Sequence, residues 1–268
     1  MKRKLISVFL FLTVFLSVFA IHEKYSEGYE MLSSKVNTKD YEKAMSFLNE
    51  KVVYSVIKEG GKPILYMATV NDSIELEDVE EMSELTKLGI YGTFGHDEAL
   101  NKIYFSKYDK STKNYMLYES TLKKNKWSKP KKLKIKGISS YRKDGSPLVN
   151  AGWLYRAPGI SGFFNPTLAN GGERIYFTSD FPIGEGGKDI WYINKEGKQW
   201  SSPENLGEFV NTKGREDYAF VSGDSLLYFA SDNGFENMNL YVSKKENGEW
   251  TEAVLLDSVY NSSSANDY

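Results

Sequence analysis

Short apolar bursts, each carrying a tyrosine, recur along the chain at wide and similar intervals. The tyrosines are Tyr54, Tyr104, Tyr176 and Tyr228, and the steps between them are 50, 72 and 52 residues. A period of about 50 residues is typical of propellers and arrays, because one such unit cannot bury its apolar face alone. The pattern therefore predicts a repeat architecture, whose chemistry has to be argued separately from its site.

Each unit contains further features in a fixed order. A second apolar burst follows the first across a turn rich in Gly or Asn, such as Gly184–Gly187. A tryptophan motif comes next in every unit but the first, as in Trp200-Ser201-Ser202-Pro203, and an apolar stretch after each linker precedes the first burst. Four short strands per unit predict an all-β fold, a β-propeller of four-stranded antiparallel blades. The units span residues 36–86, 87–136, 163–210 and 211–257.

Four blades are clear, and two segments leave the blade number open. Residues 137–162 are surplus to the period, and they form either two strands of an irregular fifth blade or a long loop between blades. The fifth-blade strands would be Ile138–Tyr141 and Trp153–Tyr155. Residues 25–32 have helical spacing, but their register relative to Asn37 favours an outer strand that closes the ring.

The first 20 residues are predicted to be a secretory signal peptide. Lys2, Arg3 and Lys4 form a positive start, and an almost wholly apolar run follows and ends at Ala20. An uncleaved membrane anchor is the alternative, although the run is shorter than the ~20 residues that a spanning helix needs. The chain has no cysteine, so a lipoprotein anchor and disulfides are excluded. Residues 21–268 are then expected to form one exported propeller domain with no transmembrane span.

The charge of the chain argues against nucleic acid as a partner. Removal of three basic residues with the signal takes 34 to 31 against 36 acidic residues, a charge of about −5. Lysines nevertheless cluster over residues 123–136, at the end of the second unit, and acids cluster over residues 75–84. The lysines are either a site for an anionic polymer or lipid head group, or protection of an exposed outer strand against edge-to-edge pairing.

The later units resemble a known repeat family. The segments that carry the resemblance are Arg174-Ile175-Tyr176-Phe177-Thr178-Ser179-Asp180, Gly186–Trp191, Trp200–Leu206 and Leu227–Asn233. They are similar to the TolB-type (WD-like) β-propeller repeat, specifically over residues 163–268 and loosely over 36–136. The resemblance implies a binding or scaffolding role in the periplasm or outer envelope, without catalysis. Such repeats often stand beside an OmpA-type peptidoglycan-binding module, which this chain lacks. Its last residues, Asn266-Asp267-Tyr268, resemble the first strand of a further blade, as in a truncated protein.

Candidate catalytic chemistry is sparse. The run His96-Asp97-Glu98 contains metal-ligating residue types, but a single histidine is weak support for a metal, and none is expected. No cofactor is expected either, because the turn at Gly184–Gly187 lacks the Lys-Ser/Thr of a phosphate loop. Asp180 and Asp232 recur at one place in their units, which favours a repeated structural hydrogen bond over an active site.

The predicted function is that of a non-catalytic exported propeller that binds an envelope protein or a cell-wall glycan. Its expected contact surface is the mouth where the linkers between blades meet. The candidate binding residues are Asn165, Arg215, Glu216, Asp217 and Tyr218, with Asp97 and Glu98 opposite. The alternative is a glycoside hydrolase that uses two of the inner-strand carboxylates, Asp97, Glu98, Glu216 and Asp217.

Overall fold

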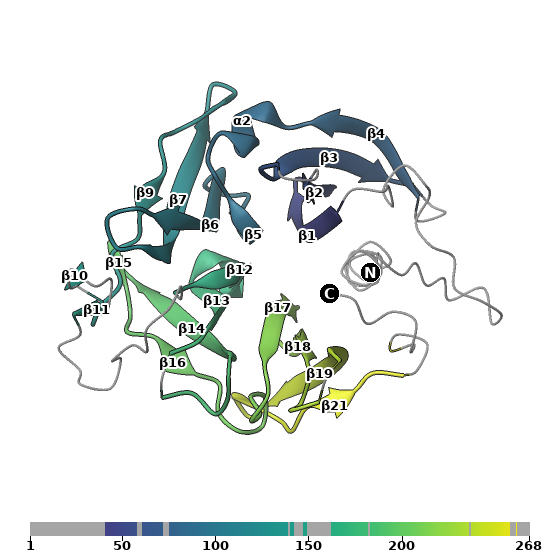
Figure 1. Cartoon of the computed structure of the whole chain (residues 1–268), viewed down its shortest axis with the longest axis vertical. Coiled ribbons are helices and arrows are strands. Elements are labelled where there is room, and N and C mark those ends of the chain that lie inside the picture. The colour runs from purple at the N-terminus through teal and green to yellow at the C-terminus, as the bar shows by residue number, and fades with distance from the viewer. Residues whose placement is uncertain are drawn as a thin grey trace. The chain divides into compact units, whose positions relative to one another are not determined.

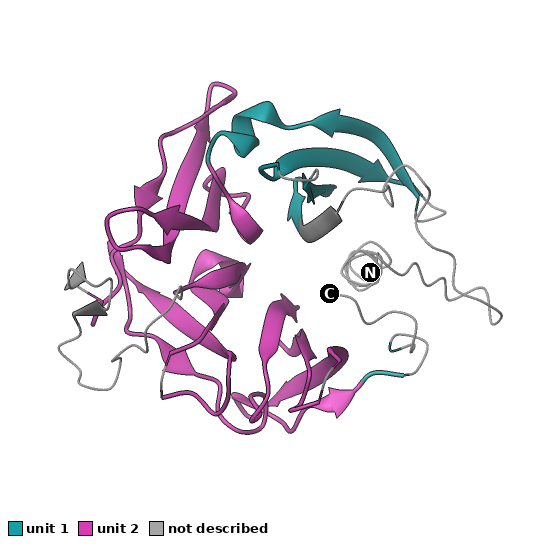
Figure 2. Cartoon of the chain, viewed as in Figure 1, with its two compact units in different colours: residues 1–88, 256–268 teal, residues 89–255 magenta. Residues whose placement is uncertain are grey.

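The chain is all-β, and its four antiparallel sheets have the blade topology of a β-propeller, as the sequence predicted (Figure 1). The computed structural model describes residues 41–57, 61–71, 75–138, 140–141, 147–148, 162–181, 183–235, 237–257 and 261. The predicted signal peptide, the segment 25–32 and the last predicted strand lie outside these residues. Two compact units are present, Met1–Leu88 with Leu256–Tyr268 and Gly89–Leu255 (Figure 2).

The first unit contains blade 1. Its strands, in hydrogen-bonded order, are β1 (Tyr41–Leu48), β2 (Lys51–Ile57), β3 (Ile64–Val70) and β4 (Leu76–Glu81), followed by the short helix α2 (Ser83–Thr86). Val52, Tyr54 and Leu76 are buried in the core of this sheet. No helix in the described part of the chain is long and apolar enough to cross a membrane.

The second unit contains three blades. Blade 2 comprises β5 (Tyr91–Asp97), β6 (Lys102–Asp109), β7 (Asn114–Lys123), β8 (Lys126–Trp127) and β9 (Lys131–Lys132). Blade 3 comprises β12 (Phe164–Ala169), β13 (Arg174–Ser179), β14 (Asp189–Glu196), β15 (Gln199–Trp200) and β16 (Glu204–Asn205). Blade 4 comprises β17 (Glu216–Ser222), β18 (Leu226–Ser231), β19 (Asn239–Glu246), β20 (Glu249–Trp250) and β21 (Val254–Leu255). Tyr104, Tyr176 and Tyr228 lie on the second strand of their blades, where the repeat placed them.

The outermost strand of blades 2, 3 and 4 is split into two short segments, which the sequence pattern did not predict. After Trp200 the chain leaves the ladder, and Ser201 bonds the third strand twice. Its N–H donates to the Asn194 carbonyl at 2.8 Å, and its hydroxyl accepts from the Asn194 N–H at 3.0 Å. The same pair of bonds recurs in the other two blades: Ser128 with Thr121, and Thr251 with Lys244. A hydroxyl residue after each tryptophan therefore holds the break in the strand.

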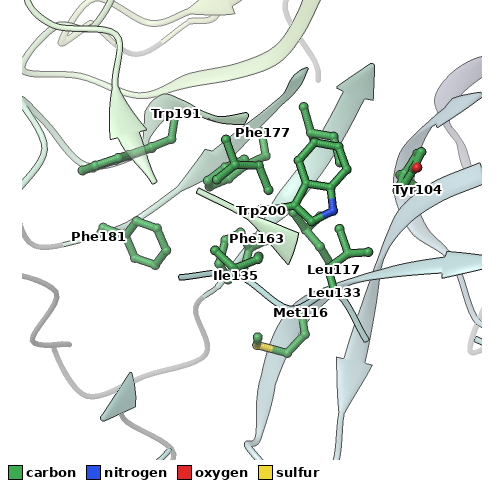
Figure 3. Close-up of a cluster of buried hydrophobic side chains, with 12 residues drawn as sticks. Tyr104, Met116, Leu117, Leu133, Ile135, Phe163, Phe177, Phe181, Trp191 and Trp200 are labelled. Carbon is green, nitrogen blue, oxygen red and sulfur yellow. The ribbon is translucent and has the colours of Figure 1, made fainter. Parts of the chain in front are cut away.

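The main core of the second unit lies between blades 2 and 3 (Figure 3). Phe177 and Trp191 of blade 3 are fully buried there, and the ring of Tyr104 from blade 2 meets Trp200 edge to face at 5.6 Å. A second cluster joins blades 3 and 4 around Tyr176, Ile190, Phe229 and Trp250. Neighbouring blades thus bury one another's aromatic side chains.

The surplus segment forms a small antiparallel pair, β10 (Ser140–Tyr141) with β11 (Pro147–Leu148). The other predicted strand of a fifth blade, Trp153–Tyr155, lies outside the described residues, so the fifth blade stays a prediction.

Part of the lysine cluster lies on the outermost strands of blade 2: Lys126 is on β8, and Lys131 and Lys132 form β9. Lys132 forms an ion pair with Asp109, and Lys131 lies 3.7 Å from Glu119, both on inner strands of the same sheet. Lys136 pairs with Glu196 of blade 3. Part of the cluster therefore pairs with acids of the fold itself, which leaves fewer of its lysines for an anionic ligand.

Truncation of the buried Trp191 to alanine should lower the free energy of unfolding by about 3–5 kcal/mol, because it leaves a large cavity between blades. Urea denaturation followed by circular dichroism measures the change. Phe235→Ala is the matched control, since that ring is 74% exposed, and it should change stability by less than about 0.5 kcal/mol. Equal effects of the two substitutions would contradict the assigned core.

Candidate functional site

The innermost strands β5, β12 and β17 share an irregularity close to the end at which they begin, here called the leading end. In each strand the pairing register shifts within four residues of that end. The residue at the bulge has positive φ: Gly92 at 71°, Asn165 at 45° and Tyr218 at 55°. β-bulges of this kind increase the local twist and redirect side chains. Figure 1 shows the three strands on the inner side of their sheets.

The Asn165 side chain links the innermost strands of three blades. Its Oδ1 accepts a hydrogen bond from the Thr93 N–H of blade 2 at 3.3 Å, and its Nδ2 donates to Asp217 Oδ1 of blade 4 at 2.7 Å. Asn165 is only 4% exposed. A Cβ at Gly92 would lie 1.9 Å from Asn165 Oδ1, so only glycine allows this approach. Asn165 was predicted to bind a ligand, and in the structure it holds the blades together.

The Asp217 carboxylate is also occupied by the fold. Its Oδ1 accepts from the Tyr218 N–H at 2.8 Å as well as from Asn165, and its Oδ2 lies 3.4 Å from Lys188 Nζ. The Lys188 ammonium in turn lies 4.9 Å from the centre of the Phe164 ring. Both oxygens of this carboxylate therefore have partners within the fold.

Arg215 and Asp232 form a tight pair within blade 4. The Asp232 carboxylate accepts hydrogen bonds from the Arg215 backbone N–H at 2.8 Å, from Arg215 Nε at 2.7 Å and from the Gly234 N–H at 3.0 Å. Burial alone would raise the pKa of Asp232, but these hydrogen bonds outweigh it and lower the pKa. In blade 3, Asp180 accepts from the Gly162 N–H at the corresponding place. The recurring aspartate therefore ties the end of the second strand to the start of the first.

Glu216 is completely buried. Its Oε1 accepts from the hydroxyls of Ser231 at 2.6 Å and Thr212 at 2.7 Å, and its Oε2 accepts from the Thr212 N–H. Burial raises the pKa of Glu216, although these hydrogen bonds oppose the shift, and the nearby Asp189 adds to the rise. Glu216 thus fastens the linker between blades 3 and 4 to its own blade and does not face solvent.

Asp97 and Glu98 lie at the other end of β5. Thr93, which contacts Asn165, is four residues from Asp97, or about 13 Å along an extended strand. Asp97 Oδ1 accepts from the Leu100 N–H at 3.1 Å and so caps the turn to β6, while Glu98 is exposed. The structure therefore brings five of the seven predicted residues to the leading end and separates Asp97 and Glu98 from them.

His96, which the sequence suggested as a weak candidate for a metal ligand, lies beside Asp97 at the same end of β5. Burial lowers the pKa of His96, against the opposing effects of Glu98 and Asp97. Among the described residues, no group of three or more His, Cys, Asp or Glu is arranged to hold a metal ion.

A cluster of aromatic rings at the leading end escaped the sequence analysis. We call Tyr91, Tyr108 and Tyr115 the tyrosine face. Tyr91 is the first residue of β5, Tyr108 is the last but one of β6, and Tyr115 is the second of β7. The Tyr115 ring is 4.3 Å from Tyr91 and 5.6 Å from Tyr108, and it is 5.3 Å from Phe164 of blade 3. In an antiparallel sheet the start of one strand lies beside the end of the next. Tyrosines at the start, end and start of three successive strands could therefore have predicted this cluster from the sequence.

No protein-family model matches the chain, and no curated protein matches it. Solved structures with a similar chain path include TolB from Acinetobacter baumannii, with 11% identity and a TM-score of 0.48 over 80% of this chain and 43% of that one. Putative TolB from Agrobacterium tumefaciens has 12% identity and a TM-score of 0.45 over 82% of both chains. An α-L-arabinofuranosidase from Fusarium graminearum has 10% identity and a TM-score of 0.46 over 81% and 65%. The chain thus spans less than half of the first protein, and similarity this low says nothing about activity.

Substitution of Asn165 by alanine should destabilise the protein by about 1–3 kcal/mol, because it removes the acceptor of the buried Thr93 amide and one of the two donors to Asp217 Oδ1. The comparison is Asn233→Ala, which changes an exposed asparagine with nearly the same positive φ, 46°. The control removes the backbone contribution, so the difference between the two urea midpoints measures the link between blades. No difference would mean that Asn165 does not carry this link.

The stability of the protein should depend on the charge of Asp232. Because its pKa is lowered in the folded state, the stabilisation is present above the unfolded value of about 4 and is lost as the pH falls through the lower folded value. Asp232→Asn should therefore flatten the decline in unfolding free energy on acidification, measured by urea denaturation at several pH values. Glu98→Gln, at the other end of the strands, is the charge control. A variant that keeps the full wild-type decline would contradict the role of this pair.

Proposed function

We propose that the protein is an exported, non-catalytic β-propeller that binds a protein or glycan of the bacterial envelope at its leading end. The observation that carries this proposal is the use of the leading-end acids by the fold itself. Glu216 is fully buried, Asp217 and Asp232 are each paired with a cation, and the exposed Glu98 lies at the other end of β5. The exposed groups that remain at the leading end are mainly aromatic and cationic, with Glu185, 40% exposed in its side chain, as an acid among them.

Hydrolysis of a glycosidic bond makes a different demand on the site. It needs two carboxyl groups on either side of the bond, about 5–5.5 Å apart for retention and about 6.5–9.5 Å for inversion. Asp97 and Asp217 belong to opposite ends of the innermost strands, and Glu216 has no exposed surface. The candidate acids therefore give little support to the hydrolase alternative.

The proposed location rests on the sequence. A basic start followed by an apolar run and Ala20 is typical of a secretory signal, and a chain without cysteine is stable in an oxidising compartment without disulfides. We propose the periplasm or the outer-membrane surface as the site of action. The net negative charge agrees with a partner other than nucleic acid.

The purified protein is expected to bind an envelope component without cleaving it. Arabinan, xylan and peptidoglycan should release no reducing sugar on incubation with the wild type, while at least one envelope polymer or protein should be retained by the immobilised protein. Asp217→Asn is tested in parallel, with Glu98→Gln as a matched change of one carboxyl group. Sugar release by the wild type that disappears in Asp217→Asn but persists in Glu98→Gln would establish the hydrolase and overturn the proposal.

A further inference from the structure

The tyrosine face stands on paired strands at the junction of blades 2 and 3. The Phe163 N–H of blade 3 donates to the Tyr115 carbonyl of blade 2 at 3.0 Å. A Cβ at Gly162 would lie 2.0 Å from that oxygen, so the two backbones approach as closely as glycine permits. The backbone of Tyr115 is thus fixed by a contact between blades, and Tyr91 and Tyr108 pack on its ring from strands of blade 2.

The exposure of these rings calls for an explanation. Tyr91 is 43% exposed and Tyr108 is 41% exposed, while the adjoining Phe164 is buried. Single exposed aromatic side chains, such as Phe235 on its turn, are common on protein surfaces. Tyr91 and Tyr108 both contact the Tyr115 ring, so their exposed surfaces adjoin and form one small aromatic surface.

The charge beside the tyrosine face is positive at the solvent boundary. The Lys188 side chain is 37% exposed, against 11% for its partner Asp217. The Arg215 side chain is 57% exposed, against 6% for its partner Asp232. Each pair is neutral overall, but the cation faces solvent and the acid is buried. A ligand that reaches this border from the rings therefore meets ammonium and guanidinium groups.

We propose that the tyrosine face binds sugar rings of an acidic cell-wall glycan, whose carboxylates face Lys188 and Arg215. This inference rests on the proposed envelope-binding function and names its ligand class. The C–H groups of a sugar ring pack well on aromatic faces, because those faces carry negative charge density. Sugar hydroxyls can exchange hydrogen bonds with the tyrosine hydroxyls, which both donate and accept.

The size of the face favours a glycan over a protein. A standard protein interface buries about 800 Å² on each partner. An aromatic side chain carries roughly 150–250 Å², and Tyr91 and Tyr108 expose less than half of theirs. The face thus matches one or two sugar rings and falls well short of a protein interface.

The test measures co-sedimentation of the purified protein with isolated peptidoglycan sacculi over a range of protein concentrations. The double variant Tyr91→Ala/Tyr108→Ala should weaken binding by about tenfold or more, as expected for aromatic anchors. Phe209→Ala, a 54% exposed ring whose backbone bonds Ala253 on the outer side of blade 4, should leave it unchanged. Tyr108→Phe keeps the ring and should retain most of the affinity. Sacculi whose carboxyl groups have been amidated should bind several times more weakly, and added salt should weaken binding to untreated sacculi.

The outcomes separate this inference from the proposed function. Sacculus binding that is the same in the double variant, with circular dichroism showing all variants folded, would overturn the glycan assignment and leave the binding function intact. Absence of sacculus binding together with capture of a defined envelope protein that Tyr108→Ala abolishes would also overturn it, since the occupant would then be a protein. Cleavage of the sacculi by the wild type would instead overturn the non-catalytic function, whatever the double variant does.

Discussion

The structure depends on the burial of aromatic side chains between neighbouring sheets. A single four-stranded blade has two faces and cannot cover either of them alone. Phe177 and Trp191 of blade 3 belong to one buried cluster with Tyr104, Met116 and Leu117 of blade 2. The same arrangement recurs around Tyr176 and Trp250 between blades 3 and 4. Without disulfides, these contacts are the main source of stability in the second unit, because apolar burial is the dominant favourable term in folding.

This packing creates a second requirement, at the inner edges of the sheets. The innermost strands approach so closely that a Cβ at Gly95 would lie 2.7 Å from the backbone of Leu168. Backbone and side-chain polar groups at such an edge lose water and need partners within the protein. Asn165, Asp217 and Thr93 meet this need by bonding one another across three blades. Asn165 and Asp217, which the sequence suggested as ligand contacts, thus have structural partners, and their role in binding stays a prediction.

The sequence was a better guide to the repeat than to the site, and the reason is physical. Tyrosines on second strands and Gly- or Asn-bearing turns follow from local backbone preferences and from burial, which a single chain shows as periodicity. The recurring Asp232 was correctly interpreted as structural because one active site cannot repeat in every unit. Burial of Glu216 and the separation of Asp97 from Asp217 depend instead on which strand ends meet in space. Strand direction alone would have placed Asp97 at the far end of β5, since Thr93 is near its start.

The leading end combines a fixed framework with uncommitted surface, and this combination is what a binding site needs. The acids there stabilise the fold, so their bonds hold the strand ends of blades 3 and 4 in position before any ligand arrives. The Tyr115 ring is anchored through its own backbone to blade 3, whereas Tyr91 and Tyr108 leave a large part of their surface to solvent. Rings that are already ordered lose little conformational entropy when a ligand covers them, so more of the contact energy appears as affinity. The same polar bonds that occupy these carboxylates thus hold the strand ends beside the neighbouring aromatic surface.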